Sequence, residues 1–85
     1  MKVLMPSSLL SYTGTSRVEA SGTTLAELVA DLERRYPGIR FRVIDEQDRV
    51  RGHMRFFVNN EQVFDLSHRL RPNDEVCLMQ ALSGG

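Results

Sequence analysis

The residues of this sequence with the clearest chemical potential are its last three, Ser83, Gly84 and Gly85, which follow a hydrophobic run. Two adjacent glycines lack Cβ atoms and adopt backbone angles closed to other residues, so they can pass through a channel in which side chains would clash. Gly85 would then present an unhindered α-carboxylate. Because the negative charge of a carboxylate repels nucleophiles, this group must first be activated, for example as a mixed anhydride with AMP.

The activating site is expected on another protein, because no phosphate-binding glycine loop is found in the sequence. His53 and His68 are fifteen positions apart without companion ligands, so no zinc site is expected. The acidic group within residues 45–48 lacks the pattern of a calcium loop and is interpreted as a polar turn. Cys77 has no sequence neighbour that would lower the pKa of its thiol, which favours a packed or interface thiol over a nucleophile.

Length and charge restrict the class of protein. The 85 residues suffice for one domain, and the formal net charge of zero argues against a protein that coats nucleic acid or an anionic membrane. A single cysteine excludes an internal disulfide. No signal peptide is visible and no segment approaches the roughly 20 apolar residues of a membrane span, so a cytoplasmic location is expected. Arginines cluster between residues 34 and 55 with acidic residues interspersed, which favours a solvated face or a docking rim over a phosphate track.

The first part of the chain predicts a hairpin. Lys2–Met5 and Ser16–Ala20 have the composition of short strands, and Pro6 ends the first of them. The intervening stretch, Ser7–Thr15, is rich in turn residues and is expected to be a loop with a bend at Gly14.

The clearest predicted element is an amphipathic helix. Its apolar residues recur at i, i+3, i+4 and i+7 and are expected to face a sheet: Leu25, Leu28, Val29 and Leu32, continued by Tyr36. Thr24 and Glu27 have the spacing of a capping box, in which Thr24 accepts an early backbone N–H and Glu27 reaches back. Pro37 and Gly38 predict the end of the helix.

The middle of the chain predicts a short helical turn and a second hairpin. Within Arg40–Met54, the apolar side chains of Phe41, Val43 and Ile44 are expected to pack, and a polar loop follows them. Arg55–Val63 is predicted to form a strand, a tight turn at Asn59-Asn60 and the start of another strand.

A return loop and a final strand complete the pattern. Leu66 and Leu70 are expected to fix the return loop, and Arg71–Asp74 has turn composition. In the final strand, Glu75–Leu82, apolar residues point both ways: Val76 and Leu78 toward one face, Cys77 and Met79 toward the other. The strand is therefore either central and covered on both faces, or its outer face meets a partner. The order of elements predicts an α+β domain with one main helix across a mixed sheet, a β-grasp arrangement over residues 1–81, followed by a flexible tail, residues 82–85.

Three short motifs in this order resemble the MoaD/ThiS family of ubiquitin-like sulfur carriers. They are "VNN" (Val58–Asn60) before the return loop, "NDEV" (Asn73–Val76) at the start of the last strand, and "SGG" at the end. The similarity spans essentially the whole chain. The sequence departs from many relatives at Asn60, where they have glycine, and in a longer loop through Gln47–His53.

The resemblance implies a carrier without catalytic residues, metal or tightly bound cofactor. An E1-like adenylyltransferase/sulfurtransferase uses ATP to adenylate Gly85, and sulfur then replaces AMP to give a thiocarboxylate. The tail, Leu82, Ser83 and Gly84 included, enters the active site of a sulfur-accepting biosynthetic enzyme. The family also implies an apolar docking patch on the sheet near the last strand. The expected positions are Met5, Val63 and Met79, with ordinary core packing equally open for the first two.

Two other functions stay open. A ubiquitin-like modifier would become attached to lysines through Gly85 and would need the same activation chemistry. A structural subunit of a larger enzyme would keep its activity without Gly84 and Gly85.

Overall fold

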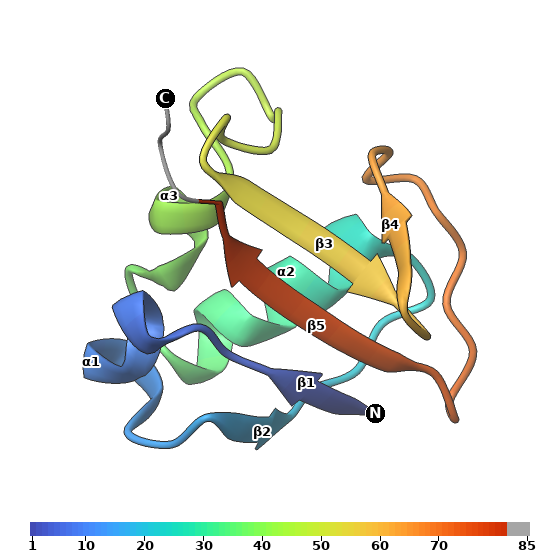
Figure 1. Ribbon diagram of the computed structural model, residues 1–85, viewed down its shortest axis with the longest axis horizontal. Helices are drawn as coiled ribbons and strands as arrows, with labels where there is room; N and C mark the ends of the chain where they lie inside the picture. Colours follow the sequence, from blue (N-terminus) through green and yellow to red (C-terminus); the bar gives the residue numbers. More distant parts are fainter. Residues whose placement is uncertain (82–85) are drawn as a thin grey trace.

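A mixed five-stranded sheet organises the computed structural model, which describes residues 1–81 (Figure 1). The predicted tail, residues 82–85, lies outside the described residues. The strands follow the order β2-β1-β5-β3-β4, and β1 and β5 are parallel while all other neighbours are antiparallel. Their bounds are Lys2–Leu4 for β1, Arg17–Glu19 for β2, Met54–Val58 for β3, Glu61–Val63 for β4 and Glu75–Gln80 for β5. Both predicted hairpins and the predicted final strand are confirmed.

The main helix, α2 (Leu25–Arg35), lies across one face of the sheet, as predicted (Figure 1). Its apolar stripe is almost wholly buried against side chains from the inner face of the strands, which stabilises both layers by removing apolar surface from water. The largest fully buried side chains include Leu25, Leu28 and Leu32 from the helix, and Val3, Phe56, Val76 and Leu78 from the sheet.

Side chains hold the start of α2 and the turn that follows its end. Thr24 Oγ1 accepts the Glu27 N–H at 3.2 Å, as expected, but the Glu27 carboxylate reaches one residue beyond the cap, to the N–H and hydroxyl of Thr23 at 2.9 and 2.6 Å. At the other end Gly38 has a φ of 98°, and Glu33 accepts the N–H groups of Gly38 and Arg40, both at 2.9 Å. This second carboxylate holds the chain as it turns into the next helix.

The segment after Gly38 is helical, but one predicted contact is wrong. α3 (Ile39–Val43) directs Ile39 and Val43 into the core, where Ile44 joins them, whereas Phe41 is 58% exposed. Residues four apart lie on the same side of a helix, so Ile39 and Val43 share a face and Phe41 lies on the other.

The stretch between β1 and β2 is also more ordered than expected. The predicted loop forms a 3-10 turn, η1 (Ser7–Leu9), and a short helix, α1 (Leu10–Thr13). Leu9 is fully buried and holds the segment to the core. Gly14, at the predicted bend, ends α1 with a φ of 74°.

The two internal family-like motifs meet in space. Asn59 and Asn60 have φ values of 51° and 72°, which form the expected tight turn between β3 and β4. The Asn59 side chain donates to Asp74 Oδ1 at 2.8 Å and accepts the Glu75 N–H at 3.0 Å. The "VNN" turn therefore holds the "NDEV" segment at the point where β5 begins.

A buried carboxylate connects α2 with the segment before it. Asp31 accepts hydrogen bonds from the Arg34 side chain, from the Ser21 N–H at 2.9 Å and from Arg35 Nε at 2.9 Å. The Arg34 contact and the Ser21 N–H hold the pKa of this carboxyl well below its ordinary value of 3.8.

We predict that Asp31→Asn lowers the melting temperature at pH 7 by several degrees. Because the folded-state pKa is depressed, the charged carboxylate stabilises the fold fully above about pH 3.9, the unfolded value, and this contribution is lost as the pH falls further. The melting-temperature gap between wild type and variant, followed by circular dichroism, should therefore narrow below that pH. Asp48→Asn, which removes an exposed ion pair with Arg40, is the control and should have little effect. A gap that stays constant down to pH 2 would contradict this account.

Gly22 allows the approach of the chain to the start of α2. A Cβ atom at this position would lie 2.5 Å from Leu28 N and 2.9 Å from the carbonyl carbon of Glu27. Both are backbone atoms of the helix and cannot rotate away, so only glycine fits.

Gly22→Ala should therefore destabilise the fold by about 1–3 kcal/mol, the usual cost of overpacking. Gly52→Ala is the matched control, because a Cβ there has no atom within 4 Å. Urea unfolding of the two variants measures the difference, and equal midpoints would disprove the close-approach explanation.

Candidate functional site

The strand that leads to the chain's last residues is the central strand of the sheet. β5 is hydrogen-bonded to β1 on one side and to β3 on the other. The ladder continues one residue beyond it, where the Ala81 N–H donates to the His53 carbonyl at 2.7 Å. The direction in which the chain leaves the sheet is therefore fixed at Ala81. The predicted acyl-carrying segment, Leu82, Ser83, Gly84 and Gly85, lies outside the described residues.

The outer face of the sheet carries an apolar patch at its centre. Helices α2 and α3 pack on the inner face (Figure 1), and within residues 1–81 no helix lies over the outer one. In register, Cys77 of β5 faces Leu4 of β1 and Phe57 of β3, and all three side chains are half-buried. Met79, two residues further along β5, is 49% exposed. We call these four residues the outer-face patch. Two arrangements were left open for the last strand. β5 is the central strand of the sheet, but residues 1–81 place no second layer over its outer face.

Two of the three predicted docking positions need correction. Met5 is 7% exposed and belongs to the core, so it offers almost no surface to a partner. Val63 is half-buried and pairs with buried Phe56, which places it on the inner face as well. Only Met79 lies on the outer face as expected.

Sequence reasoning missed two residues of the patch, Leu4 and Phe57. Leu4 directly precedes Met5, and Phe57 follows Phe56, which is buried. Because successive side chains in a strand alternate between faces, the alternation along β1 and β3 was the signal that could have found them.

Cys77 is a packed thiol rather than a nucleophile. Burial, followed by the nearby charge of Glu75, raises the pKa of the Cys77 thiol. Because the thiolate is the reactive form, a raised pKa leaves the group protonated and inert at neutral pH.

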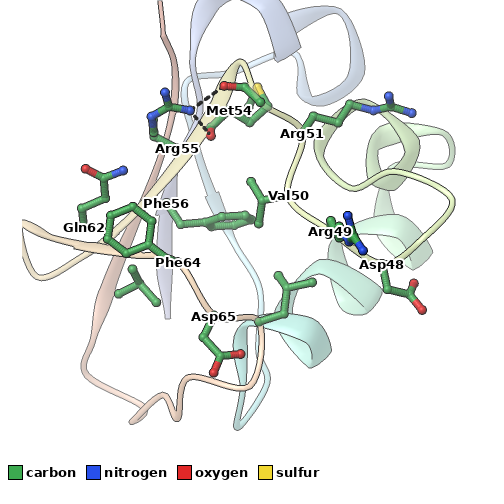
Figure 2. Close-up of a pocket in the computed structure, with 13 residues that line it drawn as sticks. Asp48, Arg49, Val50, Arg51, Met54, Arg55, Phe56, Gln62, Phe64 and Asp65 are labelled. Carbon is green, nitrogen blue, oxygen red and sulfur yellow. Dashed lines mark hydrogen bonds between the residues drawn. The ribbon is translucent and has the colours of Figure 1, made fainter.

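A hollow lies on the inner side of the β3–β4 hairpin. It has a volume of about 700 Å³ between that hairpin and the loop after α3, and Figure 2 shows Phe56 and Val50 lining it. Phe64, which is 79% exposed, lies at its edge. Its carboxylates are already engaged: Asp48 pairs with Arg40, and Asp65 accepts the Ser67 N–H at 2.9 Å.

Residues 1–81 contain neither a candidate metal cluster nor a helix that could span a membrane. Among residues 1–81, no three or more histidine, cysteine, aspartate or glutamate side chains are grouped so that they could hold a metal ion. In that range, too, every helix is too short or too polar to cross a bilayer.

Known proteins resemble this chain over nearly its full length. The model of the ThiS family matches residues 3–85. The sulfur carrier protein CysO of Mycobacterium tuberculosis (strain ATCC 25618 / H37Rv) is 34% identical over 89 residues, which cover 98% of this chain and 96% of CysO.

Solved structures agree with the sequence match. A chain of the Amycolatopsis orientalis BexX/CysO complex has a TM-score of 0.90 and 31% identity, covering 99% of this chain and 98% of that one. The crystal structure of M. tuberculosis CysO also has a TM-score of 0.90 and 31% identity, with coverages of 95% and 98%. The small archaeal modifier protein 1 of Methanosarcina acetivorans, at 22% identity and a TM-score of 0.83, covering 99% of this chain and 94% of that one, is similar in fold. The predicted β-grasp fold is confirmed, and the chain belongs to the ThiS family as a homologue of the CysO sulfur carriers.

Proposed function

We propose that this protein is a sulfur carrier that works as a cosubstrate of other enzymes. The observation that carries the proposal is the match to the ThiS family and to CysO over almost the whole chain, which includes the final Ser83-Gly84-Gly85.

The proposed chemistry takes place at the Gly85 carboxylate. An oxygen of this group attacks the α-phosphorus of ATP in an E1-like partner, and pyrophosphate leaves to give an acyl-adenylate. A sulfur nucleophile then attacks the carbonyl carbon and expels AMP. When the donor is a persulfide, a thiol reductant cleaves the resulting S–S bond and is itself oxidised, which leaves the thiocarboxylate –C(O)S⁻. A sulfur-accepting biosynthetic enzyme would take the sulfur.

The described residues position the reactive end of the chain and provide a docking surface for a partner. The hydrogen bond between Ala81 and His53 fixes the point of departure from the sheet, and the four residues beyond Ala81 can reach about 14 Å when fully extended. Glycines at the end of such an arm can enter a narrow channel because they have no side chain. The outer-face patch, next to the same strand, provides an apolar docking surface.

A related structure supports a function in complexes. The Amycolatopsis orientalis CysO was crystallised with a second protein, BexX. By analogy, this chain would form successive complexes, first with the activating enzyme and then with the acceptor. The flexible side chain of Met79 suits a patch that must fit more than one partner.

Activation of the chain can be followed by intact-mass spectrometry. With ATP, a sulfur donor and the activating enzyme, the mass should rise by the difference between one sulfur and one oxygen atom. A variant that lacks Gly85 should show no such rise, whereas Arg69→Glu should behave as wild type because Arg69 is exposed at the opposite end of β3 from Ala81. Covalent ladders on other proteins, lost with Gly85, would instead indicate a modifier. Full biological activity without Gly84 and Gly85 would indicate a structural subunit.

Docking through the outer-face patch predicts a selective effect of Met79→Glu. A charge placed in an apolar contact should raise the KM for the carrier in the activation reaction about tenfold, a typical loss for a central interface residue. Leu10→Glu is the matched control, because Leu10 is also an exposed apolar residue but lies on α1, away from the sheet's outer face. Melting temperatures should confirm that both variants fold. Equal KM values for the two variants would show that the outer-face patch is not part of the docking surface.

A further inference from the structure

A basic and aromatic rim surrounds the point at which the chain leaves the sheet. Phe41 and Arg42 of α3 line a hollow of about 290 Å³ together with Arg51 and His53 from the loop before β3. The His53 carbonyl is the group that accepts the Ala81 N–H. We call these four residues the tail-root rim, because the residues that would carry the acyl group follow Ala81 directly.

The rim is held in place by contacts among its own members. Arg51 Nε donates to the Phe41 carbonyl at 2.6 Å, and the guanidinium carbon of Arg51 lies 4.6 Å from the centre of the Phe41 ring. This cation–π contact keeps an exposed aromatic ring in a fixed orientation at the surface. An exposed phenylalanine that is positioned in this way is ready to contact another surface without further ordering.

The positive charge of the rim is not neutralised within the described part of the chain. Neither Arg42 nor Arg51 has a carboxylate within 4.0 Å among residues 1–81. Asp48 pairs with Arg40. The Asp45 carboxylate accepts the N–H groups of residues 47 and 49 and is near enough to Arg51 for their charges to interact, but it forms no ion pair with either rim arginine. No carboxylate lines the hollow. In a chain of zero formal net charge, the rim is therefore a local excess of positive charge.

The short length of the segment after Ala81 requires a partner to approach this rim. Four residues span at most about 14 Å, so an active site that takes up Gly85 cannot lie farther than this from Ala81. The protein that contains that active site must consequently approach the residues around Ala81. This step rests on the proposed function, since it takes Gly85 as the reacting residue.

We propose that the tail-root rim is a docking surface for an acidic surface of the activating enzyme. Carboxylates of the enzyme pair with Arg42 and Arg51, whose planar guanidinium groups suit bidentate contacts. An apolar side chain of the enzyme covers the exposed face of Phe41. Complementary charge speeds encounter and excludes wrong partners, while the outer-face patch supplies apolar contact area.

The test is a steady-state assay of AMP release with the full chain, the activating enzyme, ATP and a sulfur donor. Arg42→Glu should raise the KM for the carrier about tenfold at low salt with kcat unchanged, because a rim charge acts on encounter and not on chemistry. The difference from wild type should shrink above about 0.5 M salt, where exposed charges are screened. The KM for ATP should stay the same. Phe41→Ala should raise the carrier KM at low and high salt alike.

Arg69→Glu is the matched control, since Arg69 is exposed and lies with Val58 and Asn59 at the opposite end of β3 from the rim. It should leave the carrier KM at the wild-type value, and melting temperatures should show that all variants fold. Equal KM values for Arg42→Glu and Arg69→Glu would overturn the proposal, and so would a change in the KM for ATP, which would make the rim a nucleotide site. If wild type releases no AMP, the proposed function fails and the rim proposal fails with it.

Discussion

The pairing of β5 on both sides is the constraint on which the rest of the molecule depends. The strand is hydrogen-bonded to β1 and to β3, and its inward side chains, Val76 and Leu78, are buried under α2. Each end of β5 has an additional contact. The Asn59 side chain holds the start, and the His53 carbonyl holds the residue that follows the end. A segment that leaves such a strand starts from a fixed point, so β5 presents the residues beyond it at a defined place on the surface.

The sheet that contains β5 has one face that forms the core, whereas its other face and the end of β5 are available for binding. Residues of the inner face form the core with α2 and α3, whereas the outer-face patch and the tail-root rim are open to a partner. These two surfaces differ in character: the patch is apolar and half-buried, and the rim is cationic and exposed. Their separation suits a small protein that contributes recognition and relies on other proteins for catalysis.

The sequence predicted those features that depend on local periodicity. The spacing of Leu25, Leu28, Val29 and Leu32 specifies a helix with one buried face, and Asn59-Asn60 tolerates the positive φ of the turn, so α2 and both hairpins were foreseen. The expected packing of Phe41 was wrong because a helix of five residues is too short for the spacing of its apolar residues to show which face is buried. Met5 and Val63 were misplaced because an error of one residue in a strand reverses the face. The tail-root rim joins residues 41–53 with Ala81, and this contact depends on the sheet pairing, which local sequence patterns do not contain.

The strand order also determines when the domain can assemble. The β1–β2 hairpin and the β3–β4 hairpin have no ladder in common, and β5 alone connects them. Since β5 is the last strand in the described chain, a ribosome has to synthesise residues 75–80 before the two halves of the sheet can join. A chain that ends before β5 would leave one edge of β1 and one edge of β3 unpaired, and such edges are prone to aggregation. The chain order therefore restricts folding to molecules that have been translated through β5.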